Sequence, residues 1–405
     1  MNEPINEAER LIQLEDRYSA HNYHPLDVML DRGEGVWLWD TEGKKYLDGL
    51  AAYSAVNQGH NHPRIVEAMQ DQLSRLSLTS RAFRNDRFGP ICEKLCVLLG
   101  YDKVLMMNSG AEAVETAIKA ARRWGYDRKG IPEDEAEILV FDGNFHGRTT
   151  TIVGFSTDEG SRRGFGPFGP GFRILPYGDL EAVERAIGPR TAAILVEPIQ
   201  GEGGVIIPPA GFLAGLRALC DQHHALLICD EIQAGLGRAG HWLAHHREGI
   251  RADAVTIGKA LSGGLYPISA FLADEEVMSV FDPGSHGSTF GGNPLACAVA
   301  EAALEVLEHE KLCERSQRLG ARFLEALEQE DLPLIEELRG AGLWIGIQLR
   351  ESAGGARRFS EALQAKGLLL KETHTHTLRF APPLVISDSE LEHALGLIVE
   401  VLATH

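Results

Sequence analysis

The chain has 405 residues, of which 44% are hydrophobic and 24% are charged, a balance typical of a globular protein with a large core and a smaller second domain. The formal net charge of −19 disfavours nucleic acid or an anionic membrane surface as a partner. No apolar run approaches the ~18 residues of a membrane span, and the acidic first residues resemble neither a signal nor a transit peptide. We therefore expect a cytoplasmic protein.

Cysteines and histidines form no metal-binding pattern in the sequence. The six cysteines are scattered, mostly within apolar helix or strand patterns, which predicts buried free thiols. The 16 histidines include close pairs such as His60 with His62 and His374 with His376, but no helical H-x-x-x-H pair and no Cys/His grid. We predict that the protein binds no metal.

The first segments in chain order predict a hairpin, a loop and two helices. Residues 35–50 alternate apolar and polar side chains around a Glu-Gly turn, which predicts a β-hairpin. Residues 51–65 are rich in small and hydrogen-bonding side chains and are expected to form a loop. Tyr53 in this loop either joins the core or lines a pocket, and both options stay open. Helical patterns follow over 63–76 and 86–100.

A candidate anion-binding turn comes next. Residues 104–107 predict a strand, and apolar residues recur at helical spacing from Val114 onward. A small-residue turn that opens a helix leaves backbone N–H groups free to hold an anion, and the helix dipole reinforces them. Ser109, Gly110 and Ala111 are therefore candidate phosphate ligands. The alternative is that Ser109 is an ordinary helix N-cap.

The loop after the following strand offers groups for a ring and for a carboxylate. Phe145 or His146 could stack on a flat ring. Arg148 could bind a substrate carboxylate, because a planar guanidinium matches it with two hydrogen bonds, or it could simply be solvated. Residues 163–172, rich in Gly, Pro and Phe, are expected to cover the site or to contact a second subunit.

Three short runs at 192–198, 225–231 and 254–260 are each apolar up to a polar residue at or near the end, namely Glu197, Asp230 and Lys259. Such runs predict strands buried on both faces of a parallel sheet. Ligands of parallel sheets bind beyond the carboxyl ends of the strands. We therefore expect Glu197, Asp230 and Lys259 to lie together at one edge.

A lysine and a carboxylate at that edge suit one cofactor. An amine that can lose its proton attacks an aldehyde to form a Schiff base, and a buried carboxylate can keep a pyridine nitrogen protonated. Pyridoxal 5'-phosphate requires both groups. The alternative is that Asp230 and Lys259 form a structural ion pair.

The rest of the chain suggests a division into three parts. After Lys259, a Gly/Ser-rich loop leads into an amphipathic helix, which places a domain boundary near residue 293. We expect 1–50 to be an N-terminal segment that packs with the small domain, 51–292 to be a large cofactor-binding domain, and 293–405 to be a small α+β domain. Arg379 follows an apolar strand and has no obvious structural partner.

Six motifs in this order, NSGAEA, FHGRT, EPIQGEGG, CDEIQAGLGR, TIGKALSGGLYP and HGSTFGGNP, resemble the class III pyridoxal-phosphate aminotransferases of fold type I. The segments HNYHPL, AAYSAVNQGHNHP, LTSRAF, GFGPFGPGF and RFAPPLVI resemble the ornithine δ-transferring branch of that class. The resemblance implies an α/β fold with a mostly parallel central sheet, helices on both faces and a smaller α+β C-terminal domain. It also implies a homodimer with shared active sites, or a higher oligomer.

Carried over motif by motif, the resemblance implies roles at the cofactor. Lys259 would form the Schiff base and then shuttle a proton. Asp230 would pair with the pyridinium nitrogen, Gln233 would hydrogen-bond the phenolic oxygen, and Phe145 would stack on the ring beside His146. Two departures concern fine tuning only, because some ornithine enzymes have Trp where this chain has His146 and NTG where it has NSG.

The phosphate group would be held by residues of two subunits, namely a helix-opening turn from one and a Gly/Ser-rich loop from the other. These residues are Ser109, Gly110, Ala111, Ser288 and Thr289.

The ornithine branch further implies transfer of the δ-amino group of L-ornithine to 2-oxoglutarate, giving glutamate 5-semialdehyde and glutamate by a ping-pong mechanism. Arg379 would be masked by Glu202 while ornithine is bound, and released to bind the α-carboxylate of 2-oxoglutarate. The α-carboxylate of ornithine would go to Arg148 and Tyr23, with Tyr53 shaping specificity. Glu197, at the strand edge, joins the candidate substrate-binding residues.

Three alternatives remain from the sequence. An enzyme of the same class acting on N-acetylornithine or 4-aminobutyrate would share every cofactor residue, although Tyr23 and Tyr53 favour free ornithine. An aminomutase or decarboxylase on this scaffold would not need 2-oxoglutarate. A cofactor-binding protein without catalysis is the third alternative, and the intact Lys259 argues against it.

Overall fold

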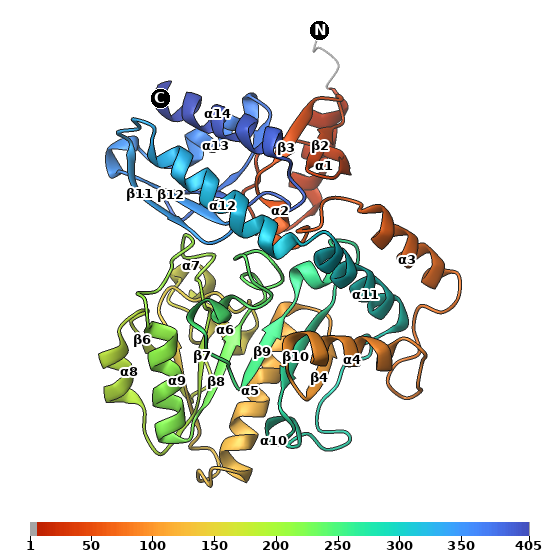
Figure 1. Cartoon of the computed structure of the whole chain (residues 1–405), viewed down its shortest axis with the longest axis vertical. Helices are drawn as coiled ribbons and strands as arrows, with labels where there is room; N and C mark the ends of the chain where they lie inside the picture. Colours follow the sequence, from red (N-terminus) through yellow and green to blue (C-terminus); the bar gives the residue numbers. More distant parts are fainter. Residues whose placement is uncertain (1–5, 405) are drawn as a thin grey trace.

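The computed structural model describes residues 6–404, and its largest element is a seven-stranded sheet in the lower half of Figure 1. In spatial order its strands are β4 (Lys103–Met107), β10 (Ser269–Ala273), β9 (Ala254–Ile257), β8 (Leu226–Asp230), β7 (Thr191–Val196), β5 (Glu137–Phe141) and β6 (Phe172–Leu175). Only β10 runs antiparallel to its neighbours. The three predicted apolar strands are confirmed as β7, β8 and β9, side by side.

Both faces of this sheet are buried, because successive side chains of a strand point to opposite sides. In β8, Leu227 and Cys229 belong to one core cluster, and Leu226 and Ile228 belong to the other. The first cluster is covered by α4 (Phe88–Leu99), α9 (Phe212–His223) and α11 (Pro294–His309), and the second is covered by α5 (Gly110–Asp127). The predicted mostly parallel sheet with helices on both faces is confirmed.

Two four-stranded sheets lie above it in Figure 1. One has the order β1 (Leu30–Glu34), β2 (Trp37–Asp40), β3 (Lys45–Asp48) and β13 (Leu368–Leu369). The other has the order β11 (Ile335–Gly340), β12 (Ile345–Leu349), β15 (Thr377–Phe380) and β14 (Lys371–Thr373). Helices α12 (Leu312–Glu328), α13 (Arg357–Ala365) and α14 (Asp388–Thr404) pack beside them.

The predicted hairpin is confirmed, since Trp37 pairs with Leu47 across β2 and β3. Strand β1 was not predicted, and it extends the hairpin by pairing with β2. Strand β3 pairs in parallel with β13, so the N-terminal and C-terminal parts of the chain share one sheet. The division at residues 50 and 292 stays a prediction, and residues 1–5 of the predicted N-terminal segment lie outside the described residues.

The segment predicted as a loop after β3 begins with a helical turn, α2 (Ala51–Ser54), whose backbone is left-handed. The predicted helices of this region are confirmed as α3 (Pro63–Leu73) and α4. The remaining elements are α1 (Glu7–Tyr18), α6 (Thr150–Val153), α7 (Glu159–Arg162), α8 (Leu180–Ala186), α10 (Glu275–Met278), η1 (Ala244–Glu248), η2 (Lys259–Ser262) and η3 (Glu351–Ala353). Within residues 6–404, no helix combines the length and apolar character needed to cross a bilayer.

Candidate active site

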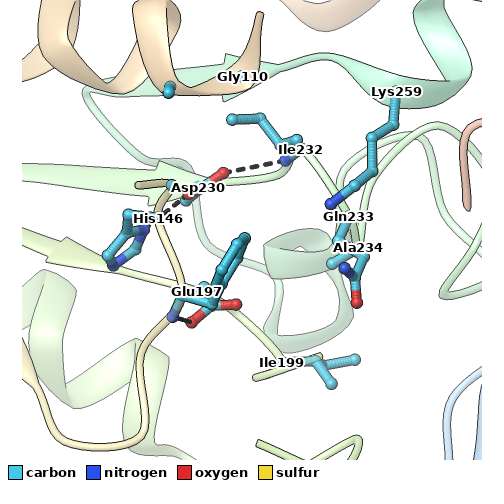
Figure 2. Close-up of a pocket in the computed structure, with 12 residues that line it drawn as sticks. Gly110, His146, Glu197, Ile199, Asp230, Ile232, Gln233, Ala234 and Lys259 are labelled. Carbon is cyan, nitrogen blue, oxygen red and sulfur yellow. Dashed lines mark hydrogen bonds and ion pairs between the residues drawn. The ribbon is translucent and has the colours of Figure 1, made fainter. Parts of the chain in front are cut away.

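A cavity of about 180 Å³ lies where β7, β8 and β9 end (Figure 2). Predicted site residues from separate parts of the chain line it together, namely Gly110, Ala111, Phe145, His146, Glu197, Asp230, Gln233 and Lys259. Figure 2 shows Lys259 reaching from η2 into the space beside Gln233, with Asp230 and Glu197 across from it. Parallel strands that end at one edge thus bring a lysine and two carboxylates to one cavity.

Asp230, at the end of β8, is fixed by three hydrogen bonds. Its Oδ2 is 2.6 Å from Nδ1 of His146, and its Oδ1 accepts from the Ile232 N–H at 3.1 Å and from the Thr256 hydroxyl at 3.0 Å. Burial disfavours a charged imidazole, but the hydrogen bond and charge of Asp230 outweigh it and raise the pKa of His146. His146 therefore orients the Asp230 carboxylate through the Nδ1 atom of its imidazole ring.

Lys259 follows β9 and lies in the first position of η2. Loss of hydration on burial lowers the pKa of its amine, although Glu202, Asp230 and Glu197 act in the opposite direction. A lowered pKa increases the share of neutral amine at a given pH, which a nucleophilic or proton-accepting lysine requires.

Glu197 is buried at the end of β7, and its Oε2 accepts a hydrogen bond from the Phe145 backbone N–H at 3.0 Å. Burial raises the pKa of Glu197 to about 7, against the opposing charge of His146. A carboxyl group with this pKa exchanges its proton near neutral pH. Such perturbed groups gather at functional sites more often than elsewhere.

The predicted phosphate-binding turn has two parts with different roles. The Ser109 hydroxyl accepts from the Glu112 N–H at 3.2 Å, and the Glu112 carboxylate accepts from the Ser109 N–H at 2.7 Å, which forms a capping box. Gly110 and Ala111 instead line the cavity. A Cβ on Gly110 would lie 3.0 Å from Ile232, so a side chain at this position would crowd the cavity wall.

Ser288 and Thr289 lie in the loop before α11, outside the cavity lining. Ser288 Oγ accepts a hydrogen bond of 2.8 Å from the side-chain amide of Asn108 in the same chain. Thr289 is exposed. The loop is therefore joined to the helix-opening turn by Asn108, and the contribution of its hydroxyls to a second subunit stays a prediction.

Arg379 and Glu202 form a short ion pair beside the cavity. Arg379 Nη1 is 2.7 Å from Glu202 Oε1, and the Arg379 side chain is only 4% exposed. Gln233, which lines the cavity, donates to the same Glu202 oxygen at 3.2 Å. Burial opposes ionisation of Glu202, but the charge of Arg379 outweighs it and lowers the pKa of Glu202. The Arg379 guanidinium also lies 5.0 Å from the centre of the Tyr53 ring.

The two predicted outer residues lie in different places. Tyr23 is 73% exposed and borders a second, apolar cavity of about 550 Å³ together with Tyr53. Arg148 is exposed, and its guanidinium lies 5.7 Å from the centre of the Phe145 ring. Tyr23 therefore lies at the same cavity as Tyr53, whereas Arg148 lies beside Phe145.

Sequence reasoning did not select Thr256 and Ile232 as site residues. Thr256 is a fully buried polar residue within β9 whose hydroxyl binds Asp230, so its interruption of an apolar run was the available signal. Ile232 packs against Gly110 and lines the cavity, and no sequence signal distinguishes it from a core isoleucine.

Comparison with known proteins gives a consistent picture. The family model described as "Aminotransferase class-III" matches residues 18–402. The chain is 55% identical over 400 residues to an ornithine aminotransferase of Bordetella pertussis, covering 99% of this chain and 97% of that protein. A crystal structure of the ornithine aminotransferase of Toxoplasma gondii superposes with a TM-score of 0.97 at 44% identity, covering 99% of this chain and 96% of the other.

A further solved structure carries a different name. The acetylornithine aminotransferase of Elizabethkingia anophelis is 48% identical with a TM-score of 0.89, covering 99% of this chain and 100% of the other. Each of these similarities extends over nearly the whole of both proteins. With the matching family model and the cavity at the ends of β7, β8 and β9, they establish that the chain belongs to the class III aminotransferases.

Proposed function

We propose that the protein transfers the δ-amino group of L-ornithine to 2-oxoglutarate, using pyridoxal 5'-phosphate. The observation that carries the proposal is the 2.7 Å ion pair between the buried Arg379 and the partly exposed Glu202, under Tyr53 and next to the cavity that Lys259 enters. An enzyme that binds ornithine and 2-oxoglutarate in turn needs a cation that can be covered and uncovered. The ornithine aminotransferases among its relatives, at 55% identity, support the same activity.

The residues around the cavity fit this cofactor. The Lys259 amine, with its lowered pKa, would bind the aldehyde, and the carboxylate of Asp230 would face the ring nitrogen. Gly110 and Ala111 begin the 18-residue helix α5 and offer its N-terminus to a phosphate. Gln233 would reach the phenolic oxygen, and Phe145 would lie against the ring. When bound, the cofactor supplies an electron-withdrawing ring that stabilises negative charge on the adjacent carbon.

The chain's own groups handle the proton and the charge. Once the substrate amine has displaced the Lys259 amine from the aldehyde, the freed Lys259 Nζ would take a proton from the substrate carbon that bears the amine and would hold that proton for return. His146 and Thr256 hold the Asp230 carboxylate in place, which keeps negative charge at one point of the cavity wall. Burial of these groups excludes water and strengthens each interaction.

Charge switching at Arg379 would select the reacting amine. With Glu202 paired to it, Arg379 does not attract the α-carboxylate of ornithine, and the δ-amine can enter the cavity. Two unit charges about 4 Å apart at an effective dielectric near 20 attract by roughly 4 kcal/mol before desolvation. A dicarboxylate can replace that interaction, so 2-oxoglutarate would displace Glu202. Arg148 and Tyr23 would hold the α-carboxylate of ornithine, and Arg148 would hold the distal carboxylate of 2-oxoglutarate.

An amine-donor panel tests the proposal. The purified protein would be given ornithine, N-acetylornithine or 4-aminobutyrate with 2-oxoglutarate, and the products would be identified by NMR. We expect ornithine to give the highest kcat/KM and glutamate 5-semialdehyde as its product. A higher kcat/KM with either of the other amines, or glutamate formation from the α-amine, contradicts the proposal.

N-acetylornithine is the second candidate substrate, and one comparison favours it. The acetylornithine aminotransferase of Elizabethkingia anophelis is 48% identical over nearly the full length. An acetylated α-amine is an amide and cannot react, so the masking of Arg379 would not be needed to choose between two amines. A Glu202→Gln variant that keeps its rate with N-acetylornithine but loses it with ornithine would separate the two.

We further propose a homodimer, or a higher oligomer, in a reducing compartment such as the cytoplasm. Support for assembly comes from large apolar side chains on the surface, including Leu73, Phe83 and Phe290, which are 57%, 71% and 48% exposed. Support for the compartment comes from the six cysteines, which are all unpaired. Analytical ultracentrifugation would test the first, and a monomer at micromolar concentration contradicts it.

A further inference from the structure

The turn that carries Tyr53 has a strained backbone. Residues Ala51, Ala52, Tyr53 and Ser54 have φ angles of 49°, 46°, 59° and 74°, so four consecutive residues with side chains hold a left-handed helical conformation. This conformation is disfavoured for L residues because Cβ crowds the following carbonyl oxygen. A run of this kind persists only where the surrounding contacts fix it.

Asp48, at the end of β3, provides those contacts. Its Oδ1 accepts from the Leu50 N–H at 2.8 Å and from the Ala51 N–H at 2.9 Å. Its Oδ2 lies 2.7 Å from Nε2 of His60. The aspartate is 3% exposed. One buried carboxylate thus holds the N–H group just before the turn and the first N–H group within it, and His60 holds the carboxylate.

The ends of the same segment are tied to the chain that follows Arg379. The Gly49 carbonyl accepts from the Ala381 N–H at 2.7 Å, and the Asn57 carbonyl accepts from the Leu384 N–H at 2.8 Å. Because both ends are anchored, the conformation of the turn between them decides where the Tyr53 side chain points. In the structure it points at the Arg379 guanidinium, with 5.0 Å from Cζ to the ring centre.

The Tyr53 ring stabilises the cation in two ways. An aromatic face attracts a guanidinium. The ring also covers the Arg379 side chain, which is only 4% exposed, and the attraction of Arg379 to Glu202 grows as the local dielectric falls. A looser turn would let water and a substrate carboxylate reach Arg379. The turn therefore affects the ion pair without touching it.

We propose that Asp48 and His60 are positioning residues, which hold Tyr53 against Arg379 and so bias transfer toward the δ-amine of ornithine. The proposal rests on the proposed ornithine activity. It also gives a role to His60, which was considered together with His62 as a possible metal ligand in the sequence. Among residues 6–404, no group of three or more His, Cys, Asp or Glu side chains is placed to hold a metal ion.

The main variant is Asp48→Ala, assayed as the cofactor-loaded enzyme. It removes both N–H contacts of the turn, and we expect the ratio of δ-product to α-product from ornithine to fall about fivefold or more, as for one or two lost hydrogen bonds. Asp48→Asn keeps an acceptor oxygen and should retain most of the ratio. NMR of the two oxo products measures it.

Asp40→Ala is the matched control. Asp40 also accepts from two backbone N–H groups, of Glu42 and Lys44, and from one side chain, the Tyr46 hydroxyl. It serves the β2–β3 turn and does not border the turn of Tyr53. We expect Asp40→Ala to lower the thermal midpoint in the way Asp48→Ala does, with an unchanged product ratio.

Relief of backbone strain gives a second test. Ala52 is exposed and has a φ of 46°, where glycine carries no steric penalty. The double variant Asp48→Ala with Ala52→Gly should therefore recover part of the lost ratio, because the left-handed turn then needs less support. If Asp48→Ala does not fold, His60→Phe removes only the contact to Oδ2 and should shift the ratio about twofold in the same direction.

Binding of glutarate, measured by calorimetry, separates this proposal from the proposed function. A dicarboxylate needs an uncovered Arg379, so Asp48→Ala should bind glutarate more tightly than the unmodified protein. If ornithine is no substrate, the proposed function fails, and the glutarate constants still test the positioning. An unchanged product ratio and glutarate constant in Asp48→Ala, or equal shifts in Asp40→Ala, overturn the proposal.

Discussion

The cofactor end and the substrate end of the site hold their charges in different ways. At the cofactor end, Asp230 receives three hydrogen bonds from groups on β9, its own loop and the loop of His146. At the substrate end, Arg379 has one short ion pair with Glu202, and its Nε has no hydrogen-bond partner among the described residues. Arg379 otherwise donates only a longer hydrogen bond of 3.4 Å to the Gly201 carbonyl. A charge held by several fixed donors stays in place, whereas a charge held mainly by one carboxylate can change partners.

The two ends also differ in how the chain builds them. Neighbouring parallel strands deliver Glu197, Asp230 and Lys259, so sheet hydrogen bonding sets their separation. Tyr53 and Arg379 come from distant parts of the chain that meet through the contacts of Gly49 and Asn57. The sheet therefore fixes the positions of the reactive groups, while substrate choice depends on loops and on a strained turn.

Removal of the lysine should have the largest effect. Lys259→Ala should lower turnover by at least about 10³-fold, because it deletes the group that moves the proton. The visible absorbance of the bound cofactor should be lost or shifted as well. Lys103→Ala, which removes an exposed lysine paired with Glu275, is the control and should behave as the unmodified protein. Full activity of Lys259→Ala would contradict the role of Lys259 at the cofactor end of the site.

Removal of the switching carboxylate should change the product. Glu202→Ala leaves Arg379 uncovered, so ornithine should shift toward transfer of its α-amine by about tenfold, corresponding to 1.4 kcal/mol. Glu202→Gln keeps the size without the charge and should shift it in the same direction. Product analysis by NMR measures the change. The same δ-product in the same proportion from both variants would contradict the idea of a replaceable partner.

Loss of the contact to Asp230 should lower the rate without changing the product. His146→Phe removes a charge-assisted hydrogen bond of 2.6 Å, which is worth about 1.5 to 3 kcal/mol, or roughly 10-fold to 100-fold in kcat/KM. His245→Asn is a matched control, because His245 makes a similar buried contact of 2.7 Å to Glu231 away from the cavity. It should lower stability only. Equal losses of kcat/KM in both would contradict a specific role of His146.

The last effect concerns stability and its dependence on pH, and it leaves the choice of substrate unchanged. A carboxyl group whose pKa is raised to about 7 keeps a proton in the folded state that the unfolded chain has released, so its contribution to stability falls as pH rises from about 4.5 to about 7. Glutamine has no proton to release, so Glu197→Gln does not lose this stability as pH rises. The free energy of unfolding of the variant minus that of the unmodified protein should therefore increase by about 2 kcal/mol from pH 5 to pH 8. Urea denaturation of the cofactor-free proteins measures it. A difference that does not vary with pH contradicts the raised pKa.

Sequence patterns predicted the rigid end more fully than the switching end. Buried strands are recognised by continuous apolar residues, so the sheet edge with Glu197, Asp230 and Lys259 was predictable. All three residues line the same cavity in the structure. The hydrogen bond of His146 was not predicted, because a histidine in a loop can equally stack, bond or face solvent. The left-handed turn at Ala51–Ser54 was not predicted either, because it contains none of the glycines that usually indicate positive φ angles.

Local sequence patterns were enough to predict the layered α/β fold, the lysine and carboxylate at the strand ends, and the helix-opening turn, because each depends on local periodicity and on the fixed direction of parallel strands. Only the tertiary structure decided that Asp48 and His60 support the turn of Tyr53 and that this ring lies over Arg379. Tyr53 and Arg379 are hundreds of positions apart, and even Asp48 and His60 are 12 residues apart. Such contacts follow from the packing of whole elements, which no local pattern encodes.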